Sequence, residues 1–160
     1  MSMVHSNLNV YLAVAEEALE ESVRFSEAAR TPKPDGQSGY VVALDPEHRS
    51  FKQSLIAIAF AGIYLESLLG LVGTERLGKA LYIKIDRQTN YEEKLPLLGV
   101  LDPSILANCK RFREARNDLM HEKAVALASL GAEGTRYAQV EATFGIEFIK
   151  SVQRKFATVP

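Results

Sequence analysis

Hydrophobic and polar positions repeat at the spacing of an α-helix along most of the chain. Between residues 7 and 29, apolar side chains recur at steps of three and four residues, and glutamates occupy the opposite face. The same spacing runs from Tyr137 to Phe156 near the end of the chain. Both stretches are therefore predicted to be amphipathic helices that pack one face against a core.

The stretch from residue 45 to residue 73 is apolar on almost every face. Asp-Pro-Glu at 45–47 predicts a helix start, because aspartate caps, proline suits the first turn and glutamate favours the positive end of the helix dipole. The helix is predicted to run to about Leu71 and to end at Gly73. Since it has no polar face, it is expected to be the most buried element.

Similar start signals predict further helices in the second half of the chain. Asp102-Pro103 repeats the earlier signal and predicts a helix that reaches at least His121. Asn-Tyr-Glu-Glu at 90–93 has the spacing of a capping box, which predicts a short helix disturbed at Pro96. Residues 74–85 are predicted to form another short helix.

Two stretches break the helical pattern. Residues 31–39 have the proline and glycine content of a loop, and residues 131–134 contain two glycines that predict a break before the last helix. No convincing set of strands is present, although residues 40–44 could be extended. The predicted fold is all-α, with residues 1–160 forming a single domain of four main antiparallel helices and several short ones in a bundle.

Composition supports a globular protein of the cytoplasm. The chain has 160 residues, of which 47% are hydrophobic and 24% charged, enough for one domain with a core. The net charge of -1 provides no bulk field to attract nucleic acid or a membrane. The N-terminus lacks the pattern of a secretory signal, and polar residues interrupt the longest apolar stretch, 55–72, so no membrane span is predicted.

The single cysteine, Cys109, excludes a disulfide within the chain and fits a reducing compartment. It lies in an apolar helical stretch, which favours a small buried hydrophobe over a reactive thiol. The three histidines, His5, His48 and His121, have no second histidine or cysteine at metal-ligand spacing. No phosphate-binding loop or dinucleotide fingerprint occurs. We therefore expect no metal and no cofactor.

One segment, 110–123, combines five cations with a histidine. On a helical wheel, Arg116 falls inside the apolar arc, between Phe112 and Met120. A guanidinium on the core side costs several kcal/mol unless it is paired and hydrogen-bonded. The predicted partner is Glu66, which lies on an apolar face of the central helix.

Two interpretations of this segment remain open. Arg116 and Glu66 could form only a buried ion pair that packs two helices together. Alternatively, Arg113, Asn117 and His121, which follow one another at four-residue steps, could form a polar stripe beside a functional arginine.

The sequence Arg-Asn-Asp-Leu-Met-His at 116–121 resembles the motif of HEPN domains, in which four to six residues separate an arginine from a histidine. Asn117 supplies the polar residue that often follows that arginine. The motif covers only six residues, but the helical architecture, its place late in the chain and the helix that follows it are also similar. The resemblance implies a small helical bundle that forms a homodimer and uses no metal.

Many HEPN domains are endoribonucleases, and others bind RNA or nucleotides without cutting. By this resemblance, Arg116 would bind the scissile phosphate, His121 would act as general acid or base, and Asn117 would orient the histidine or the phosphate. The ribose 2′-hydroxyl would be the nucleophile, so DNA would survive. The resemblance also implies an antitoxin or nucleotidyltransferase as a partner.

The remaining cations of the segment are candidates for holding an RNA backbone by charge: Lys110, Arg111, Arg113 and Lys123. In one continuous helix, Arg116 and His121 would diverge by roughly 140°. Either the helix ends before His121, or a second subunit completes the site. Three functions stay open at this point: a toxin or defence ribonuclease, a non-catalytic module for RNA or a nucleotide, and a dimerisation domain with a structural arginine.

Overall fold

The computed structural model describes residues 2–42, 47–121 and 123–158. Four long helices dominate these ranges: α1 (Ser2–Ala28), α2 (Arg49–Leu77), α5 (Pro103–Met120) and α7 (Ala132–Thr158). Three shorter helices connect them: α3 (Lys79–Gln88), α4 (Tyr91–Leu97) and α6 (Lys123–Ser129). A small hairpin pairs β1 (Arg30–Pro32) with β2 (Tyr40–Val42) around the 3-10 turn η1 (Pro34–Gly36).

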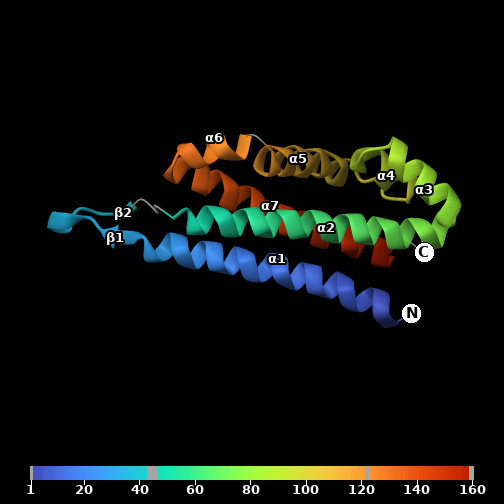
Figure 1. The fold of residues 1–160 in the computed structure, drawn as a ribbon, viewed down its shortest axis with the longest axis horizontal. Coiled ribbons are helices and arrows are strands. Elements are labelled where there is room, and N and C mark those ends of the chain that lie inside the picture. Colours follow the sequence, from blue (N-terminus) through green and yellow to red (C-terminus); the bar gives the residue numbers. More distant parts are fainter. Residues whose placement is uncertain (1, 43–46, 122, 159–160) are drawn as a thin grey trace.

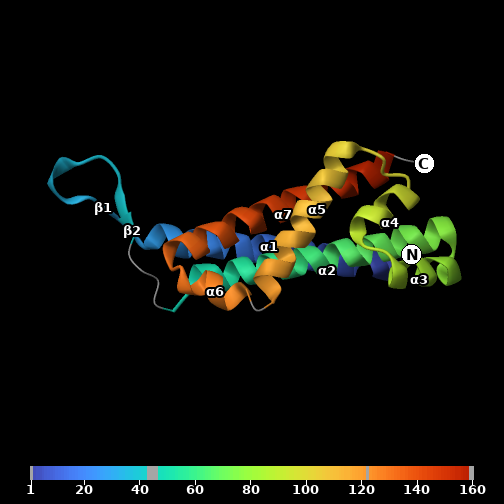
Figure 2. The ribbon, with the colours of Figure 1, turned by 90° about the horizontal axis from the view of Figure 1, so that it is seen from above.

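The long helices form a bundle in which successive members alternate in direction (Figure 1). Both chain termini lie at one end, and the β1–β2 hairpin projects from the other. Seen from above, α5 crosses the bundle obliquely, and α3 and α4 lie at the end of the bundle away from the hairpin (Figure 2). The all-α prediction is confirmed.

The central helix is α2, which packs against α1, α7, α5 and α3. Its buried residues outnumber those of any other helix described, as its apolar pattern predicted. At one end, Ser54 and Ser50 of α2 hydrogen-bond Ser22 of α1, with Oγ–Oγ distances of 2.8 and 3.0 Å. Because all three side chains are buried, these bonds fix how α1 lies along α2.

Both predicted ends of α2 are wrong. The helix begins at Arg49, after His48 adopts a left-handed backbone conformation with φ 51° that interrupts the helical path. Of the predicted start at 45–47, Asp45 and Pro46 lie outside the described residues. The helix also continues through Gly73 to Leu77, and the ring of Tyr82 packs directly on that glycine and leaves no room for a Cβ atom. Gly73 therefore serves a close contact between helices.

The two caps in the second half of the chain form as predicted. Asn90 accepts a hydrogen bond from the Glu93 backbone at 3.1 Å, and the Glu93 carboxylate accepts one from Asn90 at 2.9 Å. Asp102 accepts from the Ser104 backbone N–H at 3.0 Å. Hydrogen bonds from Ser104 lower the pKa of Asp102 to about 2, so the cap stays ionised.

The predicted break at 131–134 is shorter in the structure. Gly131 turns the chain with φ 59°, but Gly134 is already inside α7 and lies against the Leu127 carbonyl group, where a Cβ atom would not fit. Consequently α7 starts at Ala132, five residues before Tyr137.

The hairpin was not predicted as a strand pair. Residues 40–42 are extended as expected, and residues 43–46 lie outside the described ranges.

One helix among the described residues, α2, is long and apolar enough to cross a membrane by length and composition alone. Half of its most apolar 18-residue window is buried by the rest of the protein, and the core helix of a soluble bundle passes the same test.

On α5, Cys109 is buried as predicted, and burial raises the pKa of its thiol to about 12. The thiol therefore stays protonated at neutral pH.

Two glycines of α2 provide a matched test of this packing. Gly73→Ala forces a methyl group into the Tyr82 ring, and we expect it to lower the free energy of unfolding by about 1–3 kcal/mol. At Gly70, the new Cβ would lie 3.9 Å from Tyr82. That substitution should be neutral or stabilising by up to about 1 kcal/mol, because alanine favours a helix. Urea denaturation of both variants measures the difference, and equal effects would contradict this packing.

Candidate functional site

The sequence-predicted pair of Arg116 and Glu66 meets where α5 crosses α2. The Nη1 atom of Arg116 donates to Glu66 Oε1 at 2.9 Å and to the Tyr91 hydroxyl at 2.8 Å. Tyr91, the first residue of α4, donates in turn to Glu66 Oε1 at 2.5 Å. Three helices thus meet at a closed triangle of polar atoms, which we call the Arg116 seam, formed by Glu66, Tyr91 and Arg116.

A glycine of α2 shapes the Arg116 seam. A Cβ atom on Gly62 would lie 2.8 Å from both Cδ and Cζ of Arg116, so only glycine lets the guanidinium lie directly on the α2 backbone. The Nε atom of Arg116 is buried there, and no described residue hydrogen-bonds it. The close approach therefore leaves one buried donor without a hydrogen bond. The two hydrogen bonds of Nη1 partly offset the free-energy cost of that donor.

Tyr91 can occupy its position only as a neutral phenol. Burial raises its pKa, and the hydrogen bond to Glu66 raises it further, against the opposing effect of Arg116. A protonated hydroxyl donates to the Glu66 carboxylate and still accepts from Arg116. Lys94 of α4 lies over the same ring, with Nζ 5.6 Å from its centroid, and pairs with Asp86 at 2.6 Å. The ring is therefore held from both α3 and α4.

The predicted contact is confirmed, but its predicted burial is not. The Arg116 side chain is 27% exposed and that of Glu66 is 50% exposed, so the pair lies at the edge of the core. Long charged side chains bury their stems and carry their charges toward water. This position leaves one edge of the guanidinium within reach of a ligand.

The structure distinguishes between the two arrangements left open for His121. Helix α5 ends at Met120, and His121 has an extended backbone with φ -118° and ψ -163°. Its side chain is exposed, as is that of Asn117. Within the described ranges, no hydrogen bond joins either residue to Arg116. The histidine is therefore free of the helical 140° constraint.

The predicted RNA-holding arginines do not share one face. Arg111 reaches across to α7, where it donates twice to Glu141 at 2.8 and 3.1 Å and lies over the Phe144 ring at 3.9 Å. Arg113 points the other way, to Glu92 of α4 at 2.9 Å. Because each guanidinium is paired with a carboxylate on another helix, both arginines help to hold helices together, and their role in holding an RNA backbone stays a prediction.

The two lysines of the segment make fewer contacts with other helices than the two arginines do. Lys110 lies 4.0 Å from Glu114 on the exposed side of α5, and this loose pair leaves it able to contact a polyanion. Lys123 begins α6, and its side chain lies outside the described part of the protein.

Two residues of the site were not predicted from the sequence, Gly62 and Tyr91. Gly62 carried a signal, since it precedes Glu66 by four residues on the same helix face.

No group of three or more potential metal ligands occurs among the described residues. A scan against protein-family models, a search of curated proteins and a search of solved structures each return no match to this chain. The residues and their geometry therefore carry the functional argument alone.

The Tyr91 hydroxyl can be tested by removing it without changing the ring. Tyr91→Phe leaves Glu66 and Arg116 without their shared partner, and we expect the free energy of unfolding to fall by about 1–2 kcal/mol. Tyr40→Phe is the control, because that side chain is exposed on the hairpin, and its effect should stay within about 0.5 kcal/mol. Chemical denaturation measures both, and a Tyr91 variant as stable as the control would contradict the bonded triangle.

Proposed function

We propose that the chain is a HEPN-like endoribonuclease of the toxin or defence type that cuts RNA without a metal ion. One observation carries the proposal. The Arg116 seam holds a partly exposed guanidinium in place, and α5 ends one residue before His121, whose side chain is exposed. A fixed cation and an accessible proton-transfer group are what such a reaction needs.

Arg116 is suited to hold a phosphate while Glu66 keeps it in place. Its Nη1 atom is used within the seam, but its Nη2 atom makes no hydrogen bond to any described residue. A phosphate oxygen could accept from Nη2 without breaking the contact with Glu66. The carboxylate therefore positions the arginine rather than blocking it.

The proposed reaction removes one proton from the RNA and donates one proton to it. A general base removes the proton from the ribose 2′-hydroxyl, and that oxygen attacks the neighbouring phosphorus as the bond to the 5′-oxygen breaks. A general acid protonates the leaving 5′-oxygen. His121 serves one of these steps, Arg116 stabilises the charge on the phosphate oxygens, and Asn117 orients them. The products carry a 2′,3′-cyclic phosphate and a 5′-hydroxyl group.

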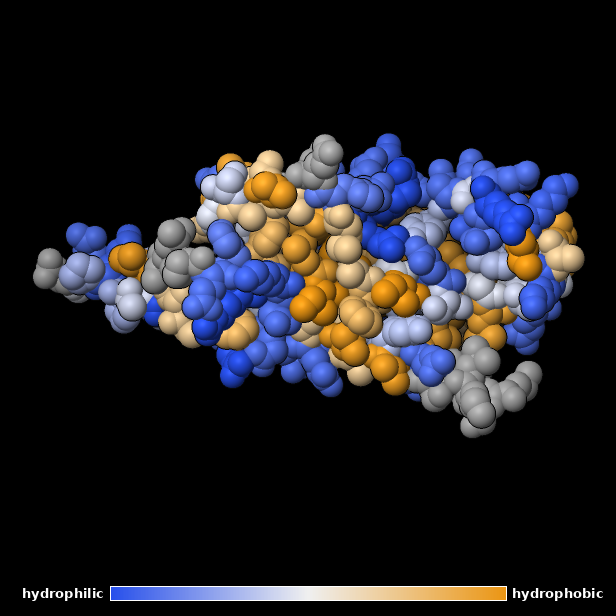
Figure 3. Space-filling model, viewed as in Figure 1, coloured by the Kyte–Doolittle hydropathy of each residue, from blue (hydrophilic) through white to orange (hydrophobic). Residues whose placement is uncertain are grey.

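A second copy of the chain would supply the other imidazole. Figure 3 displays an apolar band over α6, α2 and α1, and exposed apolar side chains on these helices include Val10, Ile56 and Val125. Exposed apolar patches mark interaction surfaces. They support a homodimer, in which two His121 side chains share a cleft. An antitoxin or a nucleotidyltransferase partner rests on the family resemblance alone.

A non-catalytic role has its own support. Arg111, Arg113 and Arg116 are each paired with a carboxylate on a different helix, α7, α4 and α2 respectively. Such pairing is typical of arginines that fix helix packing. On this alternative the chain is a dimerisation domain, or a module that binds RNA or a nucleotide at the Arg116 seam without cutting it.

Cleavage of mixed cellular RNA in EDTA tests the proposal. The wild-type protein is expected to cut, and His121→Ala should reduce the rate by at least about 100-fold, as loss of a general acid or base does. His5→Ala is the control histidine variant and should cut normally. RNA bound but uncut by the wild type would favour the binding module. Cleavage unchanged in a folded His121→Ala protein would refute the nuclease.

The position of Arg116 can be tested without changing Arg116. Gly62→Ala displaces the guanidinium from the α2 backbone, and we expect cleavage to fall by roughly 10- to 100-fold, since small displacements of positioned groups are costly. Gly70→Ala on the same helix is the control and should retain activity. Equal rates for the two variants, each with normal circular dichroism, would show that the position of Arg116 does not matter.

A further inference from the structure

The cations of neighbouring helices are engaged to different degrees. On α5, the three arginines are each paired with a carboxylate of another helix. On α3, the side chains of Lys79, Lys84 and Arg87 are exposed, and none of them pairs with an acid in the described part of the chain. We call these three residues the α3 cations. Because no described acid engages them, their charges are available to a ligand.

The one acid of α3 does not offset this charge. The Asp86 carboxylate accepts a hydrogen bond from Lys94 Nζ of α4 at 2.6 Å, and the Lys94 side chain is only 9% exposed. A buried ammonium needs a close carboxylate, so Asp86 is committed to that pair. The α3 cations therefore produce a local positive charge on a protein whose net charge is -1.

The face of α2 that carries the Arg116 seam also carries α3. Arg116 lies on Gly62, and the Tyr82 ring of α3 packs on Gly73, eleven residues farther along the same helix. Eleven residues make about three helical turns, so both contacts lie on one face, roughly 16 Å apart along the axis. At about 3.4 Å per nucleotide, a strand of roughly five nucleotides spans that distance.

The end of α3 is joined to the seam through one lysine. Lys94 pairs with Asp86, and its Nζ atom also lies 5.6 Å from the centroid of the Tyr91 ring. Arg87 follows Asp86 directly in the chain and precedes Tyr91 by four residues. Lys84 comes three residues before Arg87, a spacing that makes the two side chains neighbours on the helix surface. Lys84 and Arg87 therefore extend the polar surface of the seam along α3.

The exposed side of α3 is polar. Helices α3, α4 and α5 lie on the same side of α2 (Figure 1), and the surface over α3 and α4 is mostly hydrophilic (Figure 3). The buried side of α3 carries Tyr82, whereas a helix that binds a membrane turns its apolar side outward. Leu81 and Ile83 are exposed, but residues two apart do not share a face. Helix α3 therefore suits a polyanion better than a membrane.

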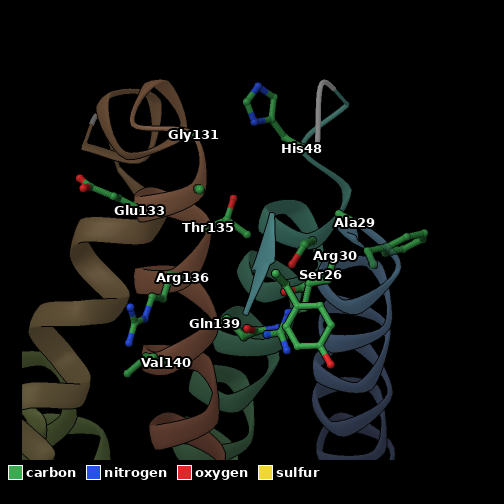
Figure 4. A pocket seen from close by; sticks show the side chains of 14 residues that line it. Ser26, Ala29, Arg30, His48, Gly131, Glu133, Thr135, Arg136, Gln139 and Val140 are labelled. Atoms are coloured by element: carbon green, nitrogen blue, oxygen red, sulfur yellow. The ribbon is translucent and has the colours of Figure 1, made fainter. Parts of the chain in front are cut away.

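The pocket at the hairpin end does not gather its cations in this way. Arg30 and Arg136 both line this pocket of about 620 Å³. However, Arg136 projects from the flank of α7 that faces away from Arg30 (Figure 4). The two guanidinium groups therefore do not converge on one group of a ligand, and Arg136 is useful instead as a control for tests on α3.

We propose that the α3 cations hold the backbone of a single RNA strand that also lays a phosphate on Arg116. Each cation neutralises a phosphate and releases a counterion, which requires no particular base sequence. The inference rests on the proposed function in taking RNA as the ligand. It does not require cleavage, because a module that binds RNA without cutting it would use the same surface.

Binding of the full chain is measured with a strand that cannot be cut. A fluorescent RNA of about ten nucleotides exceeds the span between Arg116 and α3. Its 2′-O-methyl groups remove the nucleophile and leave the phosphates in place. Fluorescence anisotropy at several salt concentrations gives the Kd and its salt dependence. The wild-type protein is expected to bind, and to bind more weakly as salt rises.

A matched pair of double variants locates the surface. Lys84→Gln with Arg87→Gln should weaken binding at least about fivefold and reduce the salt slope by about 1.4, the value for two phosphate contacts on a single strand. Lys52→Gln with Arg136→Gln removes the same charge near the hairpin end and should bind as the wild type does. All four side chains are exposed, so the melting temperatures should stay equal.

The outcomes separate the surface from the reaction. Equal Kd values for the two double variants would overturn the proposal, and so would a wild-type protein that binds no RNA. Binding to vesicles of phosphatidylserine and phosphatidylcholine that the α3 variant loses, with its RNA binding unchanged, would assign α3 to a membrane instead. RNA binding that depends on α3, without cleavage of mixed cellular RNA, would refute the nuclease and leave this surface in place.

Discussion

A guanidinium at the edge of an apolar core needs a carboxylate, and the bundle is arranged so that Arg116 finds one. Glu66 comes from α2, and the Tyr91 hydroxyl that joins them comes from α4, so three helices must be in register for the triangle to close. The same contact places the start of α4 against α5, and α5 ends at Met120, just before the extended backbone of His121. Packing and candidate chemistry thus depend on one set of bonds.

Much of this could be predicted from the sequence, because helical periodicity and charge on an apolar face are local signals. The wheel placed Arg116 on the core side, and the cost of burying it pointed to Glu66, which is its partner in the structure. Tyr91 could not be predicted in the same way. It is the first residue of a seven-residue helix, and where its hydroxyl points depends on the path of α3 and α4.

Glycines account for most of the errors in the predicted boundaries. Gly73 and Gly134 look like helix boundaries by composition, yet both lie inside helices, where Tyr82 and the Leu127 carbonyl occupy the space of a Cβ atom. Gly62 has the same role beneath Arg116. A glycine that breaks a helix and a glycine that admits a neighbour are identical in sequence, and only tertiary contacts tell them apart. The ion pairs of Arg111 and Arg113 could not be predicted for a related reason, since their carboxylate partners lie on other helices.

A double-mutant cycle between Arg116→Met and Glu66→Ala probes the bond on which this arrangement rests. Methionine keeps the apolar stem and removes the guanidinium, so the cycle isolates the interaction of the charged groups. We expect a coupling free energy of about 1 kcal/mol, at the upper end for a half-exposed pair because Tyr91 completes the contact. A coupling below about 0.3 kcal/mol, within the error of additivity, would mean that the two groups do not hold the helices together.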